Sequence, residues 1–426
     1  MSTAVAPDPA AIDATTEFLV RFARVGQAAG YSTAELEQRI EALAPALGMP
    51  AIEVSAVPTE VQLSLGPLPR QQVHTLRVRP APVDLGALSQ LDDLVREVLD
   101  DRVDSAGALS RLNGLEASAQ LQPWPITLAA TGGVGFALAP LLGGGWREAI
   151  AAGLVGLVVG SMTLAARRTT ALEPVLPPLA AIAASFLAAL LVAAGLGASP
   201  DLVTLAALVS LLPGLKLTVG MGELAGKDLQ SGVANTGDAL VQLLGLVFGV
   251  EIGRSIAIAW LGAAAPVVPA AASTSAQVLA AVLAGLAFTG TLHARLRDAP
   301  FICSATLLAL TANAAGSRLI GHEAGIFGAA LVVGIAGQVV SSRLRRSALI
   351  FIVPGVLMLV PGSIGYSSAL QLLTNHAVSG ITAAFETFVT AVSIAYGLMI
   401  AAIVVPGSIT KARARRAAAA ATPPAH

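Results

Sequence analysis

Two acidic residues stand at matching places in the apolar part of this sequence. Asp238 lies six residues after Gly232, Glu386 lies six residues after Gly380, and each of these glycines follows a serine. A charged carboxyl group costs about 3 kcal/mol or more at the centre of a membrane-spanning helix, and burial favours its protonated form. We therefore expect Asp238 and Glu386 to take part in proton exchange along a transport path.

Pro–Gly pairs precede both acids, within apolar runs. Pro213–Gly214 lies in "SLLPGLKLTVGMGELAGKDLQSG", and Pro354–Gly355 and Pro361–Gly362 lie in "IVPGVLMLVPGSIGYSSALQLLTNHAVSG". Proline removes a backbone donor and glycine lets the chain change direction, so such a pair breaks a helix and frees N–H and C=O groups. Inside a bilayer a polar solute or an ion satisfies these groups. The pattern predicts a substrate site at broken helices.

Other polar residues accompany these motifs. Lys216 and Glu223 flank the glycine-rich segment, and Lys216 either contacts an anionic group of a substrate or extends toward the membrane surface. Glu251 and Arg254 are three residues apart, which predicts an ion pair on one helix face. Amide side chains either line a polar path or connect neighbouring helices; they are Asn235, Gln242, Asn313, Gln338 and Gln371.

Composition places these residues in a membrane protein. The chain has 426 residues, of which 55% are hydrophobic and 12% charged, and its mean hydropathy is +0.76. A membrane-spanning helix needs about 20 predominantly apolar residues. We predict ten such spans, at 126–143, 147–166, 175–196, 201–221, 231–253, 272–292, 300–320, 322–341, 348–371 and 378–405. The lipid bilayer is thus the expected surrounding of most of the chain.

The two patterns predict an internal duplication, in which Pro213–Gly214 matches Pro354–Gly355 with a longer spacing before the second acid. Five spans per copy is an odd number, so the second copy would enter the membrane from the opposite side, as in many secondary transporters. The predicted fold is mainly α: a polytopic ten-helix membrane protein built from two inverted five-helix repeats, preceded by a small cytoplasmic α+β domain. The predicted boundaries are 1–120 for that domain, 121–265 and 266–410 for the repeats, and 411–426 for a basic tail.

The first 120 residues carry the patterns of a soluble domain. Ser32 begins a Ser-x-x-Glu capping pattern before an amphipathic helix, and the alternating segments 51–66 and 71–80 predict short strands. The chain opens without a basic and apolar leader, so we expect this domain in the cytoplasm. The inner loops would then carry Arg167, Arg168, Lys227, Arg295, Arg297, Arg343, Arg345 and Arg346, as the positive-inside rule requires. The expected location is the inner cell membrane, with both termini cytoplasmic.

Motifs for other chemistry are absent from the sequence. It contains no GxxxxGK[ST] phosphate loop, no H-E-x-x-H pair and no cluster of histidine with cysteine, since Cys303 is the single cysteine. We expect no enzymatic activity, no metal and no cofactor, so the energy would come from an ion or substrate gradient. The basic tail favours contact with lipid headgroups over nucleic-acid binding.

The chain resembles the bacterial threonine/serine exporter family over nearly its whole length. The segments "LLPGLKLTVGMGELAGKDLQSGVANTGDAL" and "VPGVLMLVPGSIGYSSALQLLTNHAVSG" carry the resemblance, together with "GYSTAELEQRIEALAPALGM" in the soluble domain. The resemblance implies export of threonine and serine by antiport with protons, driven by the proton-motive force. The implied family positions are Pro213, Gly214, Glu223, Asp228, Gly232, Pro354, Gly355, Pro361 and Gly362, and our own candidates beside them are Lys216, Asp238 and Glu386.

Three functions remain open at this point. The first is proton-coupled export of small hydroxy amino acids. The second is export of a small dicarboxylate such as succinate, because Lys216 stands where the family more often has an uncharged residue and suits an additional carboxylate. The third is a membrane scaffold that transports nothing and whose soluble domain binds a partner; the acids inside the spans argue against it. The oligomeric state is open, a homo-oligomer included.

Overall fold

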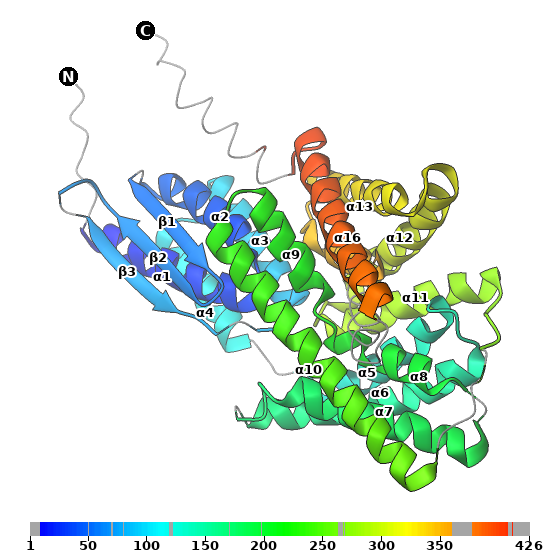
Figure 1. Cartoon of the computed structure of the whole chain (residues 1–426). Coiled ribbons are helices and arrows are strands. Elements are labelled where there is room, and N and C mark those ends of the chain that lie inside the picture. Colours follow the sequence, from blue (N-terminus) through cyan, green and yellow to red (C-terminus); the bar gives the residue numbers. More distant parts are fainter. Residues whose placement is uncertain are drawn as a thin grey trace, which may run out of the picture.

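The computed structural model describes residues 9–118 without positions 50, 70 and 80, residues 122–262 without 170 and 197, residue 267, residues 269–359, residues 377–407 and residue 411. Within these ranges the chain is mainly helical, with one small sheet near the N-terminus. Figure 1 shows this sheet and its helices at one side of the long helices. We call residues 9–118 the head and the helices from residue 124 onward the body.

The head combines a three-stranded antiparallel sheet with four helices. Their bounds are α1 Pro9–Ala29, α2 Thr33–Ala46, β1 Ile52–Val57, β2 Glu60–Leu65, β3 Gln72–Arg77, α3 Leu85–Leu99 and α4 Ser105–Ser118, and the strand order is β1-β2-β3. The predicted capping box is present, because the N–H of Glu35 donates to the Ser32 hydroxyl and the N–H of Ser32 donates to the Glu35 carboxylate. The strands and the capped helix expected from the sequence are therefore present.

The body consists of long apolar helices. They are α5 Trp124–Leu141, α6 Trp146–Arg168, α7 Leu176–Leu191, α8 Pro200–Leu208, α9 Gly214–Ala225, α10 Leu229–Leu261, α11 Thr274–Thr291, α12 Ala299–Ile320, α13 His322–Leu344, α14 Leu349–Leu359 and α16 Ala377–Val404. In the described part of the chain, eight helices are long and apolar enough to cross a membrane, and α8 with α9 forms a ninth candidate that is bent by 55°. The body is thus that of a multi-pass membrane protein.

These candidates coincide with nine of the ten predicted spans. The remaining prediction, 348–371, coincides with α14 as far as Leu359, and the rest of that span lies outside the described residues. The count of ten spans therefore stays a prediction.

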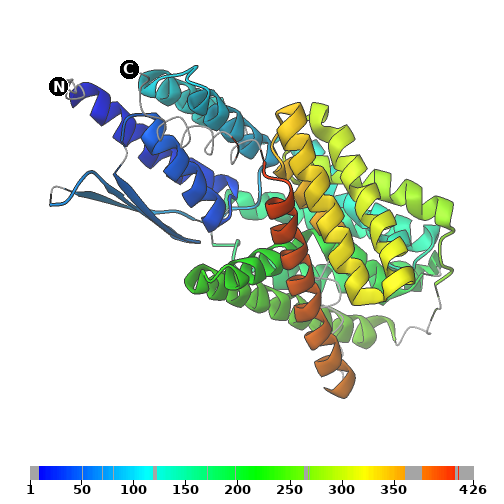
Figure 2. The ribbon, with the colours of Figure 1, turned by 90° about the horizontal axis from the view of Figure 1, so that it is seen from above.

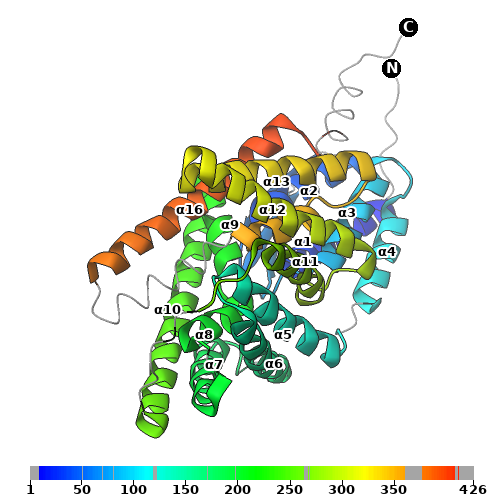
Figure 3. The same cartoon turned by 90° about the vertical axis from the view of Figure 1, so that its right-hand side faces the viewer.

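The body helices form two groups. Helices α5–α10 pack mainly with one another, as do α11–α16, and Figure 3 shows the two groups side by side. Contacts of α5 with α11, and of α9 with α14 and α16, join the groups. The short helix α9 therefore lies where the groups meet, with α10 and α16 beside it (Figure 1).

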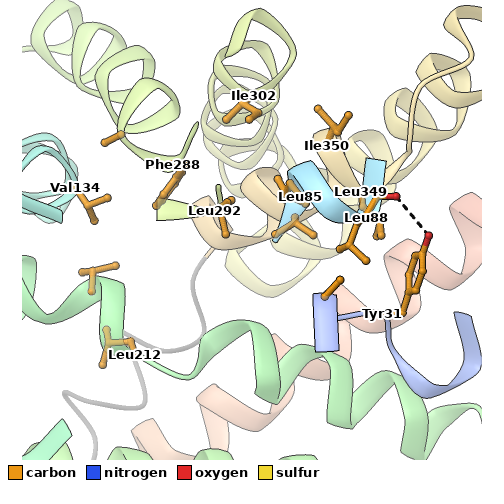
Figure 4. Close-up of a cluster of buried hydrophobic side chains, with 14 of the residues drawn as sticks. Tyr31, Leu85, Leu88, Val134, Leu212, Phe288, Leu292, Ile302, Leu349 and Ile350 are labelled. Carbon is orange, nitrogen blue, oxygen red and sulfur yellow. Dashed lines mark hydrogen bonds between the residues drawn. The ribbon is translucent and has the colours of Figure 1, made fainter. Parts of the chain in front are cut away.

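The head shares an apolar core with the body. Leu85 and Leu88 of α3 lie beside Leu349 and Ile350 of α14 (Figure 4). The backbone N–H of Leu85 also donates to the C=O of Leu292, which follows α11, at 2.9 Å. Figure 2 shows the head against one side of the body. Because buried apolar area stabilises such a contact in proportion to its size, the head is packed onto the body rather than tethered to it.

Candidate functional site

The break predicted at Pro213–Gly214 is present. A 3₁₀ turn extends α8 to Leu211, Leu212 is extended with a ψ of 132°, and α9 begins at Gly214. The axes of the two helices differ by 55°. Proline lacks the N–H that would continue the helix, and the first N–H groups of α9 have no acceptor in their own helix. The break thus places a helix N-terminus, with its partial positive charge, inside a candidate span.

Lys216, Asp238 and Gln242 form a polar cluster at this break. Lys216 Nζ lies 2.7 Å from Asp238 Oδ2 and 3.2 Å from Gln242 Oε1. Gln242 Nε2 donates to the backbone C=O of Leu211, the last residue before the break, at 2.7 Å. The side chains of Lys216 and Asp238 are 45% and 60% exposed, so protein does not enclose this ion pair. The Asp238 carboxylate is therefore exposed and paired with Lys216 rather than buried between helices.

Glu386 lies on α16, which packs against α9. Leu217 of α9, Ala239 of α10 and Ala391 of α16 form one buried cluster. Asp238 directly precedes Ala239, and Glu386 precedes Ala391 by five residues, so both helices that carry the acids pack against α9 here. Among the described residues, Glu386 is also exposed.

Two buried hydroxyl groups near this cluster escaped the sequence analysis. Oγ1 of Thr236 on α10 and Oγ1 of Thr390 on α16 have no hydrogen-bond partner among the described residues. Thr390 lies one turn after Glu386, and a Cβ placed on Gly220 of α9 would come within 2.6 Å of Thr236 Oγ1. A threonine in an apolar helix usually bonds its own backbone, so its type and position carry no signal of a site.

Glu223 and Asp228 lie at the other end of α9, against the head. Glu223 Oε1 accepts from the Thr33 hydroxyl of α2 at 2.7 Å, and its Oε2 accepts from Asn235 Nδ2 at 2.7 Å. Asp228 caps α10, because the N–H of Ser231 donates to its Oδ1. These two acids therefore belong to the contact between head and body, away from the cluster of Lys216.

The second predicted break, at Pro354–Gly355, is wrong, because α14 runs through it without interruption. Neighbouring helices accommodate proline in a membrane helix, and glycine here permits close packing instead. A Cβ on Gly355 would come within 2.5 Å of Val333 Cγ1 on α13. Gly232 has a similar role, since a Cβ there would come within 2.6 Å of Leu224 Cγ. Pro361–Gly362 lies outside the described residues.

One other expectation has a structural outcome. The predicted ion pair of Glu251 with Arg254 is present at 3.9 Å. In the described ranges no group of three or more His, Cys, Asp and Glu side chains is arranged to hold a metal ion.

Comparison with known proteins agrees with this architecture. The family described as "Putative threonine/serine exporter" matches residues 17–257, and a second one, "Threonine/Serine exporter, ThrE", matches residues 277–404. A protein of Corynebacterium glutamicum named threonine/serine exporter is 23% identical over 397 residues, which are 89% of this chain and 80% of that protein. An uncharacterized protein of Schizosaccharomyces pombe is 25% identical over 360 residues, 79% of this chain and 46% of the yeast protein.

No solved structure matches the chain. The first family covers more than half of the sequence, including the head, the break at Pro213–Gly214 and most of α10, and the second covers α11 to α16. This chain therefore belongs to the threonine/serine exporter family, a family of membrane transporters.

Proposed function

We propose that this protein exports small hydroxy amino acids, threonine and serine, in exchange for protons. The observation that carries the proposal is the ion pair of Lys216 and Asp238 at the broken span. A zwitterionic amino acid has the same two charges, so its carboxylate takes the place of Asp238 on Lys216 and its ammonium group takes the place of Lys216 on Asp238. No charge is then left without a partner. An unpaired charge would be costly away from water. The name of the bacterial relative supports the same substrate class.

A small dicarboxylate such as succinate suits this arrangement less well. Asp238 already neutralises Lys216 at 2.7 Å, and a second substrate carboxylate would need a cation of its own. A scaffold that transports nothing is disfavoured by membership of a transporter family. The dicarboxylate therefore remains as the alternative that the experiment below must separate.

We infer further that the body arose by duplication, with a shift of 148 residues between the copies. Asp238 lies on α10, Leu229–Leu261, and Glu386 lies on α16, which is described as Ala377–Val404. Asp238 and Glu386 are 148 residues apart, and so are Pro213–Gly214 and Pro361–Gly362. Because α14 continues through Pro354–Gly355, we match Pro213–Gly214 with the later pair in sequence, and the two copies then have the same spacing between the Pro–Gly pair and the acid.

Two close helix contacts support the duplication. Gly249 of α10 and Gly397 of α16 are also 148 residues apart. A Cβ on Gly249 would lie 2.3 Å from the C=O oxygen of Pro178 on α7, and a Cβ on Gly397 would lie 2.8 Å from that of Phe327 on α13. Equivalent glycines thus bring equivalent helix pairs together. Five spans per copy would relate the copies by inversion.

The copies differ at one charged position, and this difference separates two roles. Ile364 stands 148 residues after Lys216, so the second copy has no lysine at the place that would pair Glu386. An ionisable residue inside a span is by default a candidate for a proton relay. We assign substrate binding to Lys216 with Asp238, and proton transfer to Glu386.

Orientation follows from the loops that contact the head. Arg345 Nη2 lies 2.9 Å from Asp100 Oδ2 of the head, and Arg167 Nη2 lies 3.2 Å from His293 Nε2, beside the residue that accepts the bond from Leu85. The basic loops and the head thus share one side. The positive-inside rule supports a cytoplasmic location for that side.

Counterflow tests the proposal. Proteoliposomes are loaded in turn with threonine, serine, succinate and leucine, and uptake of the labelled compound is measured with and without an imposed pH gradient. We expect exchange with threonine and with serine. We also expect the labelled compound to accumulate in response to the pH gradient. Exchange with succinate alone would move the function to dicarboxylates, and the absence of exchange in folded protein would refute transport of these substrates.

A further inference from the structure

Thr33 connects the head with two acids of the body. It is the first residue of α2, and its Oγ1 lies 2.7 Å from Glu223 Oε1 and 3.0 Å from Asp228 Oδ2. Thr33 is 2% exposed and Glu223 is 6% exposed. The head therefore meets the end of the broken span through a buried hydroxyl group that lies between two carboxyl groups.

One hydroxyl group thus lies within hydrogen-bond distance of two carboxyl groups. It carries one proton, so as the sole donor it would divide that proton between both acceptors in a weaker three-centre bond. A proton held by one of the two acids would give each contact a hydrogen bond of its own, because that acid then donates to Thr33 Oγ1 and the hydroxyl donates to the other acid. Two neighbouring carboxyl groups can hold such a proton jointly.

The described groups around this pair bring little positive charge to it. Asn235 of α10 donates to Glu223 and brings no charge. Glu37 of α2 adds negative charge: burial raises the pKa of Glu37, the N–H of Ala56 lowers it in part, and nearby carboxylates, Asp228 and Glu223 among them, raise it further. Lys227, next to Asp228 in the chain, is exposed.

The other helices packed against α9 bring no charge to the pair. Helix α14 has no titratable residue. Helix α16 meets α9 with small side chains, since Ala391 packs on Leu217 and Ala395 lies near Gly222. The protonation of the pair therefore depends on its own two acids, on Glu37 and on the contact with Thr33.

We propose that Thr33 is a positioning residue of the transport cycle, which docks the head onto α9 while Glu223 and Asp228 share a proton. Loss of that proton at higher pH leaves two carboxylates around one hydroxyl and releases the contact. Helix α9 begins at Gly214, beside the ion pair of the substrate site, and ends at Ala225, beside Thr33, so docking restricts the movement of α9. The effect on flux rests on the proposed function, whereas the docking itself does not.

A distance measurement tests the docking. Spin labels are placed at Gln62 of the head and Arg343 of α13, both exposed, in the full chain with Cys303→Ser in lipid nanodiscs. In the protein with Thr33 unaltered, we expect the distribution of distances between the two labels to broaden as the pH rises from about 5 to about 8. Thr33→Val should give the broad distribution at every pH, with a docking equilibrium weakened by about tenfold or more, as expected for the loss of a hydrogen bond to a charged group.

Three further variants separate the hydroxyl group from other effects. Thr33→Ser keeps the hydroxyl and should restore the pH dependence. Asp228→Asn keeps the helix cap and supplies a permanent N–H donor to Thr33 Oγ1, so the head should stay docked at every pH. Thr75→Val makes the same chemical change at an exposed position of β3 and should alter nothing. A distance distribution that does not change with pH, or docking by Thr33→Val equal to that of Thr33→Ser, would overturn the proposal.

Flux provides the second readout. Threonine counterflow is measured while the pH on the head side is varied, and Thr33→Val should lose the pH-dependent step that Thr33→Ser retains. A pH-dependent change in counterflow that is equal in Thr33→Val and Thr33→Ser would overturn the positioning role. If the unmodified protein carries neither threonine nor serine, the proposed function fails, and the distance measurement still decides whether the head docks through a shared proton.

Discussion

Lys216 Nζ lies 2.7 Å from Asp238 Oδ2, although 22 residues separate them in sequence. The contact exists because α9 and α10 are consecutive helices joined by a short loop, so they pack side by side and bring these positions together. The break at Pro213–Gly214 sets where α9 begins and therefore where Lys216 stands. This ion pair connects the broken span with α10.

Removal of either charge of this pair should impair exchange itself. Lys216→Gln and Asp238→Asn each remove one charged contact to a zwitterionic substrate, which is worth about 1.5–3 kcal/mol. We expect threonine counterflow to fall by about tenfold or more in each variant. The control is Arg254→Gln, which breaks the exposed ion pair with Glu251 on the same helix. Wild-type counterflow in both test variants would refute the assigned site.

Glu386→Gln should separate exchange from coupling. The amide retains the shape of the side chain and removes the proton-binding group, so threonine counterflow without a gradient should persist. Accumulation driven by a pH gradient should be lost. In Asp238→Asn both activities should fall, because Asp238 contacts the substrate. If Glu386→Gln still accumulates threonine in response to the gradient, the proton does not pass through this residue.

The sequence predicted the helices of the body well, because long apolar runs leave a chain in lipid few alternatives to a helix. It also predicted the break at Pro213–Gly214, which is present with a bend of 55°. It failed at Pro354–Gly355, where the same dipeptide lies inside a continuous helix. A Pro–Gly pair weakens a helix in both places, and the packing of neighbouring helices decides which helix breaks. The dipeptide alone does not predict that packing.

The candidate site was predictable in its residue types and not in its grouping. Lys216 and Asp238 were chosen separately, and only the packing of α9 on α10 shows them as one ion pair. Glu223 was chosen for its place beside the glycine-rich segment and from the resemblance, and its contact with Thr33 spans 190 residues of sequence. Contacts between a soluble head and a membrane body leave no periodic pattern, so the role of Thr33 had no signal in the sequence.

A buried ion pair of the head should be essential for its stability. Arg39 Nε lies 2.8 Å from Asp92 Oδ1, and the Tyr31 hydroxyl donates to the same oxygen at 2.6 Å. Asp92→Asn leaves the Arg39 guanidinium buried without a counter-charge, which costs about 3–5 kcal/mol. We expect a lower melting temperature of the purified protein in detergent. The control is Asp13→Asn, an exposed position of α1; equal melting temperatures of the two variants would contradict the prediction.

The same pair predicts how stability depends on pH. Burial alone would raise the pKa of Asp92, but the Arg39 guanidinium and hydrogen bonds from Arg39, Ser347 and Tyr31 lower it below its usual value. A lowered pKa means that the pair stabilises the fold above the unfolded-state pKa of about 3.9 and loses this contribution as the pH falls through the lower folded-state value. The difference in melting temperature between wild type and Asp92→Asn should be constant near neutrality and shrink below about pH 4. A difference that grows with acidification would contradict this sign.

Close packing of α10 on α7 should make Gly249 intolerant of a methyl group. Alanine normally stabilises a helix by about 1 kcal/mol relative to glycine. At Gly249, however, the added Cβ would lie 2.3 Å from the C=O oxygen of Pro178, so the helices must move apart. Overpacking of this kind costs about 1–3 kcal/mol, which exceeds the gain in propensity.

The matched control lies one turn earlier on the same helix. At Gly245 the added Cβ would make an ordinary contact of 3.7 Å with Pro178 Cδ, so Gly245→Ala should keep or raise the melting temperature, whereas Gly249→Ala should lower it. Gly397→Ala should behave as Gly249→Ala does, because its Cβ would lie 2.8 Å from the C=O oxygen of Phe327. Equal stability of Gly249→Ala and Gly245→Ala would show that α7 and α10 are not in the close contact on which the proposed equivalence of the two copies rests.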